Sequence, residues 1–195
     1  MHAWRFVATL AALVSLGCAA FRQPTAPPTS PWPPAAAASK KSIRVSLAAN
    51  VAIADSAPVD APPAMVSRWR TWTEATYRDS ALFSAVVAED MPSDVRSEIR
   101  VVDSGDFRRW MAIVCGVTLF LFPAKATDHF TLHTEFKNAK GEVLATIEKS
   151  ESVDSWIGLF LIVVTPFRWP GREVGDLVTE LNRATLAEAH AQGIF

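Results

Sequence analysis

Two histidines of this 195-residue chain have a spacing that could do chemistry. On a helix, the i, i+4 separation of His129 and His133 would place two zinc ligands side by side. The residues around them alternate between apolar and polar as in a strand, where the same separation is about 13 Å along one face. No cysteine or further histidine lies close by in the sequence to complete a site. We therefore expect two solvent-exposed strand histidines and no metal site.

Two aspartates, Asp103 and Asp106, could act as a carboxylate pair in acid–base chemistry. The segment around them, DSGDF, is more typical of a turn that one aspartate caps. The sequence contains no GxSxG, no glycine-rich phosphate loop, no HExxH and no CxxC. We therefore predict no catalytic residue and no cofactor, and we expect a protein that is not an enzyme.

The composition permits one ordinary globular domain with tails. Half of the residues are apolar and a fifth are charged, which favours a packed core over general disorder. The net charge of −1 gives no overall attraction to nucleic acid. Because no stretch interleaves aromatic and basic residues as nucleic-acid binders do, we predict no nucleic-acid partner.

The first residues have the anatomy of an export signal. Arg5 provides a basic start, residues 6–16 provide a short apolar core, and Gly17 is the small residue expected before a cleavage site. An apolar core of this length suits a signal peptide better than a spanning helix. Residues 1–17 are therefore predicted to be a signal peptide.

The segment Ser15-Leu16-Gly17-Cys18 resembles the lipobox of bacterial lipoproteins, although Ser15 stands where leucine is usual. The resemblance implies that Cys18 becomes the lipidated, palmitate-bearing first residue of an envelope protein. Ala19 follows where some bacteria use aspartate as an inner-membrane signal. The resemblance therefore favours anchoring in the outer membrane, facing the periplasm, over the inner membrane.

An alternative is ordinary signal cleavage after Ala20, which would leave a secreted protein without lipid. A disulfide between Cys18 and Cys115 belongs to that alternative, because these are the two cysteines of the chain. With Cys18 lipidated, Cys115 is interpreted as a small buried apolar residue.

Residues 18–39 follow as the lipidated cysteine and a tether rich in proline and alanine. Such a composition favours an extended polyproline conformation that holds a domain away from a surface.

Residues 40–195 are predicted to form a single α+β domain. The periodicities predict strands at 43–53, 82–87 and 97–102, a hairpin within 128–152, and amphipathic helices at about 65–79 and 172–191. We expect a small mixed or antiparallel sheet with two amphipathic helices and an apolar hairpin extension. The element order is similar to small α+β modules of periplasmic proteins, and it implies no function because no motif is shared.

The hairpin register can be predicted from the turn residues 138–141. If Asn138 pairs with Gly141, and the glycine takes a positive φ, Phe136 lies opposite Val143 and Leu132 opposite Ile147. A slip by one residue would place these apolar residues opposite polar ones.

Two apolar segments, residues 110–122 and 156–167, leave the open end of this hairpin. One interpretation is a pair of short transmembrane helices, although thirteen helical residues rise only about 20 Å against a hydrocarbon thickness of about 30 Å. A second is a pair of core strands or short helices covered by the amphipathic helices. The third is an apolar hairpin presented to a membrane or to a membrane partner.

If the hairpin continues through both segments, their outer ends bring tryptophans and arginines together. Trp and Arg beside an apolar segment are typical of a membrane interface. Arginines exposed there would attract anionic lipid headgroups. The residues predicted to lie at this interface are Arg108, Arg109, Trp110, Trp156, Arg168, Trp169 and Arg172.

The sequence favours a lipid-anchored envelope protein with a non-catalytic interaction or scaffolding domain, whose partners are the membrane and an envelope protein. One alternative is a carrier for a lipid or another apolar ligand. A weaker alternative is a membrane protein with two short transmembrane helices.

Overall fold

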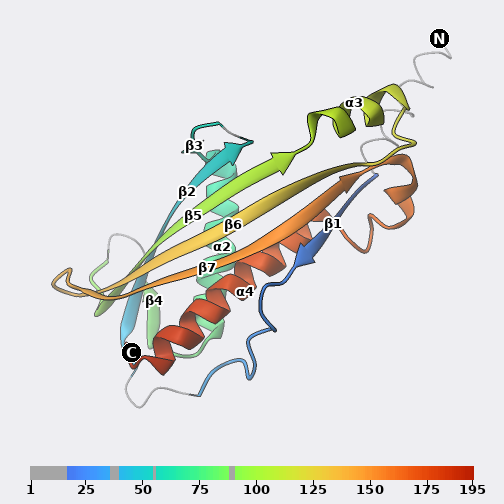
Figure 1. Ribbon diagram of the computed structural model, residues 1–195. Coiled ribbons are helices and arrows are strands. Elements are labelled where there is room, and N and C mark those ends of the chain that lie inside the picture. The colour runs from blue at the N-terminus through green and yellow to red at the C-terminus, as the bar shows by residue number, and fades with distance from the viewer. Residues whose placement is uncertain (1–16, 36–39, 55, 88–90) are drawn as a thin grey trace, which may run out of the picture.

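The computed structural model describes residues 17–35, 40–54, 56–87 and 91–195 (Figure 1). Apart from Gly17, the predicted signal peptide lies outside the described residues. In chain order the elements are β1 (Cys18–Gln23), β2 (Ser42–Ile53), β3 (Val59–Asp60), α2 (Pro63–Asp79), β4 (Ala85–Val87), β5 (Val95–Phe107), α3 (Arg109–Val117), β6 (Ala124–Asn138), β7 (Val143–Ile157), the 3-10 helix η1 (Leu159–Val163) and α4 (Pro170–Ala191).

The strands form one mixed sheet in the order β1-β7-β6-β5-β2-β3, with β4 also paired to β2. β2 runs parallel to β4 and β5, whereas the other neighbours are antiparallel. The alternation predicted for β2 is present, because Ile43, Val45 and Leu47 are buried and the residues between them are less so. The predicted α+β class is confirmed.

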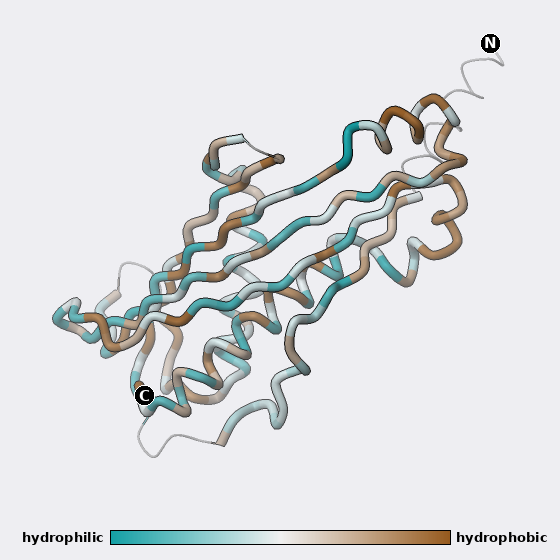
Figure 2. The backbone as a smooth tube through the Cα atoms, in the orientation of Figure 1, coloured by the Kyte–Doolittle hydropathy of each residue, from teal (hydrophilic) through white to brown (hydrophobic). Residues whose placement is uncertain are grey.

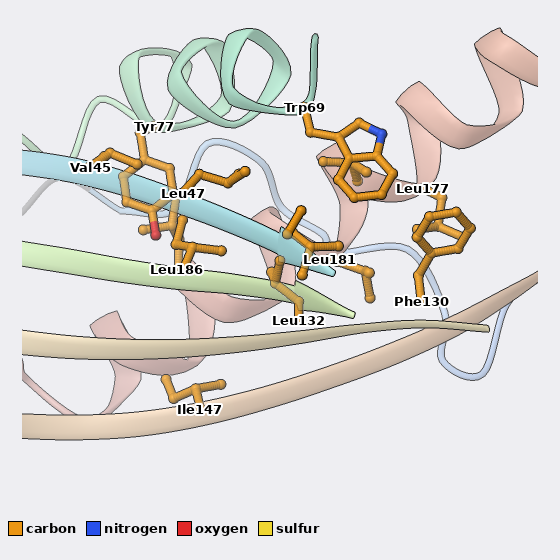
Figure 3. Packing of buried hydrophobic residues seen from close by; sticks show 14 of the residues in the cluster. Val45, Leu47, Trp69, Tyr77, Phe130, Leu132, Ile147, Leu177, Leu181 and Leu186 are labelled. Atoms are coloured by element: carbon orange, nitrogen blue, oxygen red, sulfur yellow. The ribbon is translucent and has the colours of Figure 1, made fainter. Parts of the chain in front are cut away.

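Helices α2 and α4 pack on one face of the sheet and against each other (Figure 1). In α2, Trp69, Thr73 and Tyr77 are buried at helical spacing, and in α4 Leu177 and Leu181 are buried in the same way. These side chains meet the apolar residues of the sheet in a single core (Figure 3). Both predicted amphipathic helices are therefore confirmed. The sheet face away from them is here called the outer face.

The β6–β7 hairpin exists, but the predicted register is wrong by two residues. Phe136 lies opposite Ala145 instead of Val143. The cause is an irregularity between Phe136 and Lys137 and a longer loop, in which the Asn138 side chain accepts the Glu142 backbone N–H at 3.0 Å. The turn glycine has the predicted positive φ, of 88°. Because the shift is even, the apolar side chains stay on the face toward the helices.

The described part of the predicted tether, residues 18–35, lies against the domain and does not hold it at a distance, and residues 36–39 lie outside the described residues. Its first part is β1, which pairs with β7 along its whole length. The guanidinium of Arg22 donates two hydrogen bonds, of 2.7 and 2.9 Å, to the buried carboxylate of Glu151. Further along, Trp32 packs against the core, and the guanidinium carbon of Arg183 lies 5.3 Å from the centre of its ring. Backbone pairing and this ion pair therefore fix the predicted anchor to the sheet.

Candidate functional site

The two apolar segments form one end of the molecule, here called the apolar tip and defined as residues 110–123 and 156–167. The first segment leaves β5 as helix α3 and returns to β6, and the second leaves β7 as η1 and returns to α4. Neither segment contains a charged residue. Figure 2 shows this end as the most continuously apolar part of the chain.

The chain turns back sharply within the first segment. Leu119 and Phe120 have positive φ angles of 50° and 66°, and the N–H of Phe120 donates to the Cys115 carbonyl at 2.8 Å. The Phe120 carbonyl in turn accepts the N–H of Leu159 at 2.8 Å, which links the two segments. Several backbone polar groups of the tip are therefore satisfied internally, as an apolar surrounding would require.

The predicted continuation of the hairpin is wrong. Pro123 follows the reversal and has no N–H for a sheet ladder, so pairing of β6 with β7 begins only at Ala124, opposite Ile157. Beyond that pair the chain is helical on both sides.

The apolar side chains of the tip are largely exposed. Val117 is 79% exposed, Phe160 72% and Phe167 76%. The large apolar residues exposed at or beside the tip are Phe107, Trp110, Ile113, Val114, Val117, Leu119, Leu121, Phe122, Ile157, Phe160, Val163, Phe167 and Trp169. The interpretation of both segments as core covered by the amphipathic helices is therefore wrong, because α2 and α4 lie over the sheet and do not cover the tip.

Helix α3 has nine residues. Among the described residues, no helix is both long and apolar enough to cross a membrane. Cys115 is buried on α3, as predicted, with its Sγ 3.8 Å from the carbonyl oxygen of Ile157.

Cys18, the predicted lipidation site, lies at the base of the apolar tip. It pairs with Ile157 of β7, which in turn pairs with Ala124 of β6. The carbonyl of Gly17 accepts the N–H of Gly158 at 2.9 Å. A Cβ at position 17 would lie 2.4 Å from the Gly158 oxygen, so only glycine allows the two backbones to lie this close together. Burial raises the pKa of the Cys18 thiol, and neither it nor Cys115 is in a disulfide.

The predicted interface residues surround the tip but do not meet at one point. Pairing connects Phe107 to Ala126, Ala126 to Ser155, and Ser155 to Ala20 in one row across four strands. The Ala20 N–H donates to the Arg168 carbonyl at 2.9 Å, which extends the row to the far edge.

Arg108, Arg109 and Trp110 therefore lie at one end of this row, and Arg168, Trp169 and Arg172 at the other. The prediction that they come together is wrong, because four strand spacings of about 4.8 Å, or about 19 Å in all, separate Phe107 from Arg168 along the row. We call the residues along this row, with the adjacent Lys125 and these flanking arginines, the collar.

Two cations of the collar, Lys125 and Arg168, are already neutralised. Lys125 lies 2.8 Å from the carboxylate of Asp154 and 5.8 Å from the centre of the Trp156 ring. Burial opposes the ionisation of Asp154, but hydrogen bonds from Lys125 and Thr127 outweigh it and lower the pKa of that carboxyl. Arg168 pairs with Glu173 at 3.2 Å.

Three arginines of the collar differ from these. Arg108, Arg109 and Arg172 are exposed, and none forms a salt bridge with another described residue. They leave positive charge at both edges of the tip.

The two histidines considered as metal ligands contact neighbouring side chains of the sheet. On the outer face, His129 Nδ1 is 2.7 Å from the Ser152 hydroxyl, and His133 Nδ1 is 3.1 Å from the Glu148 carboxylate. No group of three potential metal ligands occurs among the residues that the structure describes.

Asp103 and Asp106 lie within β5, so the expected turn cap is wrong. Burial, and to a lesser extent the Asp128 carboxylate, raises the pKa of Asp103 to about 7. The Oδ1 atom of Asp103 is buried and has no hydrogen-bond partner among the described residues.

An open hollow of about 560 Å³ lies on the outer face, lined by Ser46, Leu47, Ala48, Glu98, Ile99, Arg100, Val102, His133, Glu135 and Thr146. This lining contains no residue of the apolar tip.

Comparison with known proteins gives little guidance. No protein-family model matches the chain, and no curated protein matches it either. Among solved structures, it is similar to a chain described as the PelC dodecamer from Paraburkholderia phytofirmans. The two are 10% identical, the match covers 87% of this chain and 94% of that one, and the TM-score is 0.27. A similarity this low supports no conclusion about fold or function.

Proposed function

We propose that the protein is a lipid-anchored, non-catalytic interaction module of the bacterial cell envelope, whose apolar tip enters the membrane that holds Cys18. The observation that carries the proposal is the position of Cys18 at the base of the tip. A lipid on this residue would enter a bilayer at the place where the exposed apolar side chains require one.

The extent of the apolar surface supports this proposal. Soluble monomers rarely expose a contiguous apolar patch larger than a few hundred Å². The tip presents aromatic and branched side chains on α3, on the following loop and on η1, with no charge among them. In water this surface would favour self-association, whereas in a bilayer its exposure costs little.

Docking through the tip leaves the rest of the domain available to partners. The β6–β7 turn then points away from the bilayer, and the outer face, with its polar side chains, faces sideways into the water. A scaffolding role for these surfaces, in the outer membrane and facing the periplasm, fits the resemblance at residues 15–19.

Metabolic labelling tests the anchor. We expect radiolabelled palmitate to enter the wild-type protein and the Cys115→Ala variant, which retains the lipobox. The Cys18→Ala variant should remain unlabelled. Equal labelling of Cys18→Ala, or none of the wild type, would refute the anchoring proposal.

A further inference from the structure

We propose that Arg108, Arg109 and Arg172 bind the phosphates of anionic lipid headgroups, so that the apolar tip selects anionic membranes even without acylation. The inference rests on the proposed docking of the tip in a bilayer, but not on the lipid at Cys18. It identifies the class of membrane lipid that the collar recognises.

The depth of the collar suits a headgroup layer. The row through Ala20 lies two strand residues from Cys18, which is about 7 Å along the strand. A bilayer has about 30 Å of hydrocarbon within a total of about 40–45 Å, so each headgroup layer is about 5–8 Å thick. With Cys18 at the hydrocarbon boundary and the strands along the membrane normal, the collar lies among the phosphates.

The chemistry of the three side chains suits the same ligand. A guanidinium offers a planar fork of N–H donors that matches phosphate oxygens, and it stays charged at any physiological pH. The other collar cations, Lys125 and Arg168, already have carboxylate partners. Asp106 is the acidic residue nearest to Arg108 in the sequence, and its one negative charge leaves the two adjacent arginines in excess.

The separation of the arginines favours a membrane over a soluble anion. Arg108 follows the β5 end of the row and Arg172 lies beyond its other end, and the row itself, from Phe107 to Arg168, spans four strand spacings, about 19 Å. One small phosphate cannot reach both edges, whereas a lipid surface offers phosphates to both. Contact at two edges would also fix the rotation of the domain on the membrane.

Vesicle binding tests this proposal on the chain beginning at Cys18, with Cys18→Ser to exclude acylation. All described strands and helices lie within this chain, and far-UV circular dichroism checks each variant's fold. The vesicles are pure phosphatidylcholine, or phosphatidylcholine with one part in three of phosphatidylglycerol. We expect stronger binding to the anionic vesicles, and this preference should weaken at high salt because ions screen the collar.

Replacing Arg108, Arg109 and Arg172 together by Gln should weaken binding to anionic vesicles about a hundredfold, since each basic residue near such a surface is worth about tenfold or less. Binding to phosphatidylcholine should not change. The matched control replaces Arg68, Arg100 and Lys140 by Gln, which removes the same charge from exposed positions outside the collar. This control should lose less than about threefold, because it retains the collar.

A separate variant, Leu119→Asn, tests docking itself. Leu119 is 70% exposed and has a φ of 50°, a conformation that asparagine tolerates better than leucine. The variant should therefore fold normally yet bind both kinds of vesicle more weakly.

The outcomes separate the possible failures. Unchanged anionic binding by the triple Gln variant would overturn the assignment of the arginines and leave tip docking intact. No vesicle binding by the Cys18→Ser parent would overturn docking as well. Sedimentation showing a dimer that Leu119→Asn dissociates, with no vesicle binding, would assign the tip to a second copy of the chain.

Discussion

Leu119 and Phe120 adopt left-handed backbone angles that residues with a Cβ avoid, at a cost of about 1–3 kcal/mol each. The strain turns the chain so that Leu119, Leu121 and Phe122 remain exposed at the end of the molecule. A fold selected only for stability would place glycine at such a reversal. The apolar side chains kept there are what the membrane-docking proposal requires.

A single residue, Asp103, makes the free energy of unfolding depend on pH. Burial raises its pKa to about 7, against about 3.9 in an unfolded chain. The folded state therefore holds this proton more tightly. The stability linked to the proton is fully present below pH 4 and is lost as the pH rises through 7.

We expect Asp103→Asn to remove this loss. As the pH is raised from 4 to 8, the thermal midpoint of the wild type should decrease relative to that of the variant in differential scanning calorimetry. Asp106→Asn, at an exposed position three residues along β5, is the control and should follow the wild type. Parallel pH profiles for wild type and Asp103→Asn would contradict this account.

At the scale of elements, α3 begins in an electrostatically unfavourable way. Its first turn contains Arg109 and no acidic residue, and Arg108 gives no side-chain cap. Positive charge at the amino end of a helix opposes the macrodipole by about 0.3–1 kcal/mol. The stability of α3 therefore does not explain these arginines, whereas contact with an anionic surface would.

Strand β1 attaches the predicted anchor to the sheet, and its ion pair is the point at which to test that attachment. Arg22→Ala would leave the carboxylate of Glu151, 6% exposed, without its guanidinium. Because Arg22 itself is 23% exposed, we expect a loss of about 2 kcal/mol, below the usual range for a fully buried pair.

Urea unfolding measures this loss, and amide hydrogen exchange should show faster exchange in β1 than in β6. The double variant Arg22→Met, Glu151→Leu should recover most of the stability, because it removes both charges together. Protection of β1 that is unchanged in Arg22→Ala would show that backbone pairing alone holds the strand.

For the whole molecule, tip docking predicts a single orientation on the membrane. β6 has fifteen residues from the tip to the far turn, a length of about 50 Å. A domain standing on its tip would place Val117 in the hydrocarbon and Lys140 in water far from it.

Nitroxide labels at Val117→Cys and Lys140→Cys, in an acylated chain carrying Cys115→Ala, can measure these depths. We expect the first label to be accessible to oxygen dissolved in lipid, and the second to a water-soluble paramagnetic reagent. Equal accessibility of both labels to the aqueous reagent would mean that the domain does not stand on its tip.

The sequence by itself determined the class of fold and most of its elements. Period-two and helical spacings are local properties, so β2, α2, the hairpin and α4 could be recognised from residues such as Val45, Trp69 and Leu177. The uncharged character of both apolar segments was equally readable, as was the expectation that Cys115 is buried.

Only the tertiary structure decided how these elements are joined. The two-residue shift of the hairpin depends on an irregularity at Phe136, which no periodicity encodes. The pairing of Cys18–Gln23 with β7 joins segments more than a hundred residues apart, and its short, partly polar sequence carries no strong strand signal.

The exposure of the apolar tip could not be predicted from the sequence either. An uncharged segment such as 110–122 has the same composition whether helices cover it or leave it bare. The tip is exposed because α2 and α4 end over the sheet, and the tip extends past this helical layer.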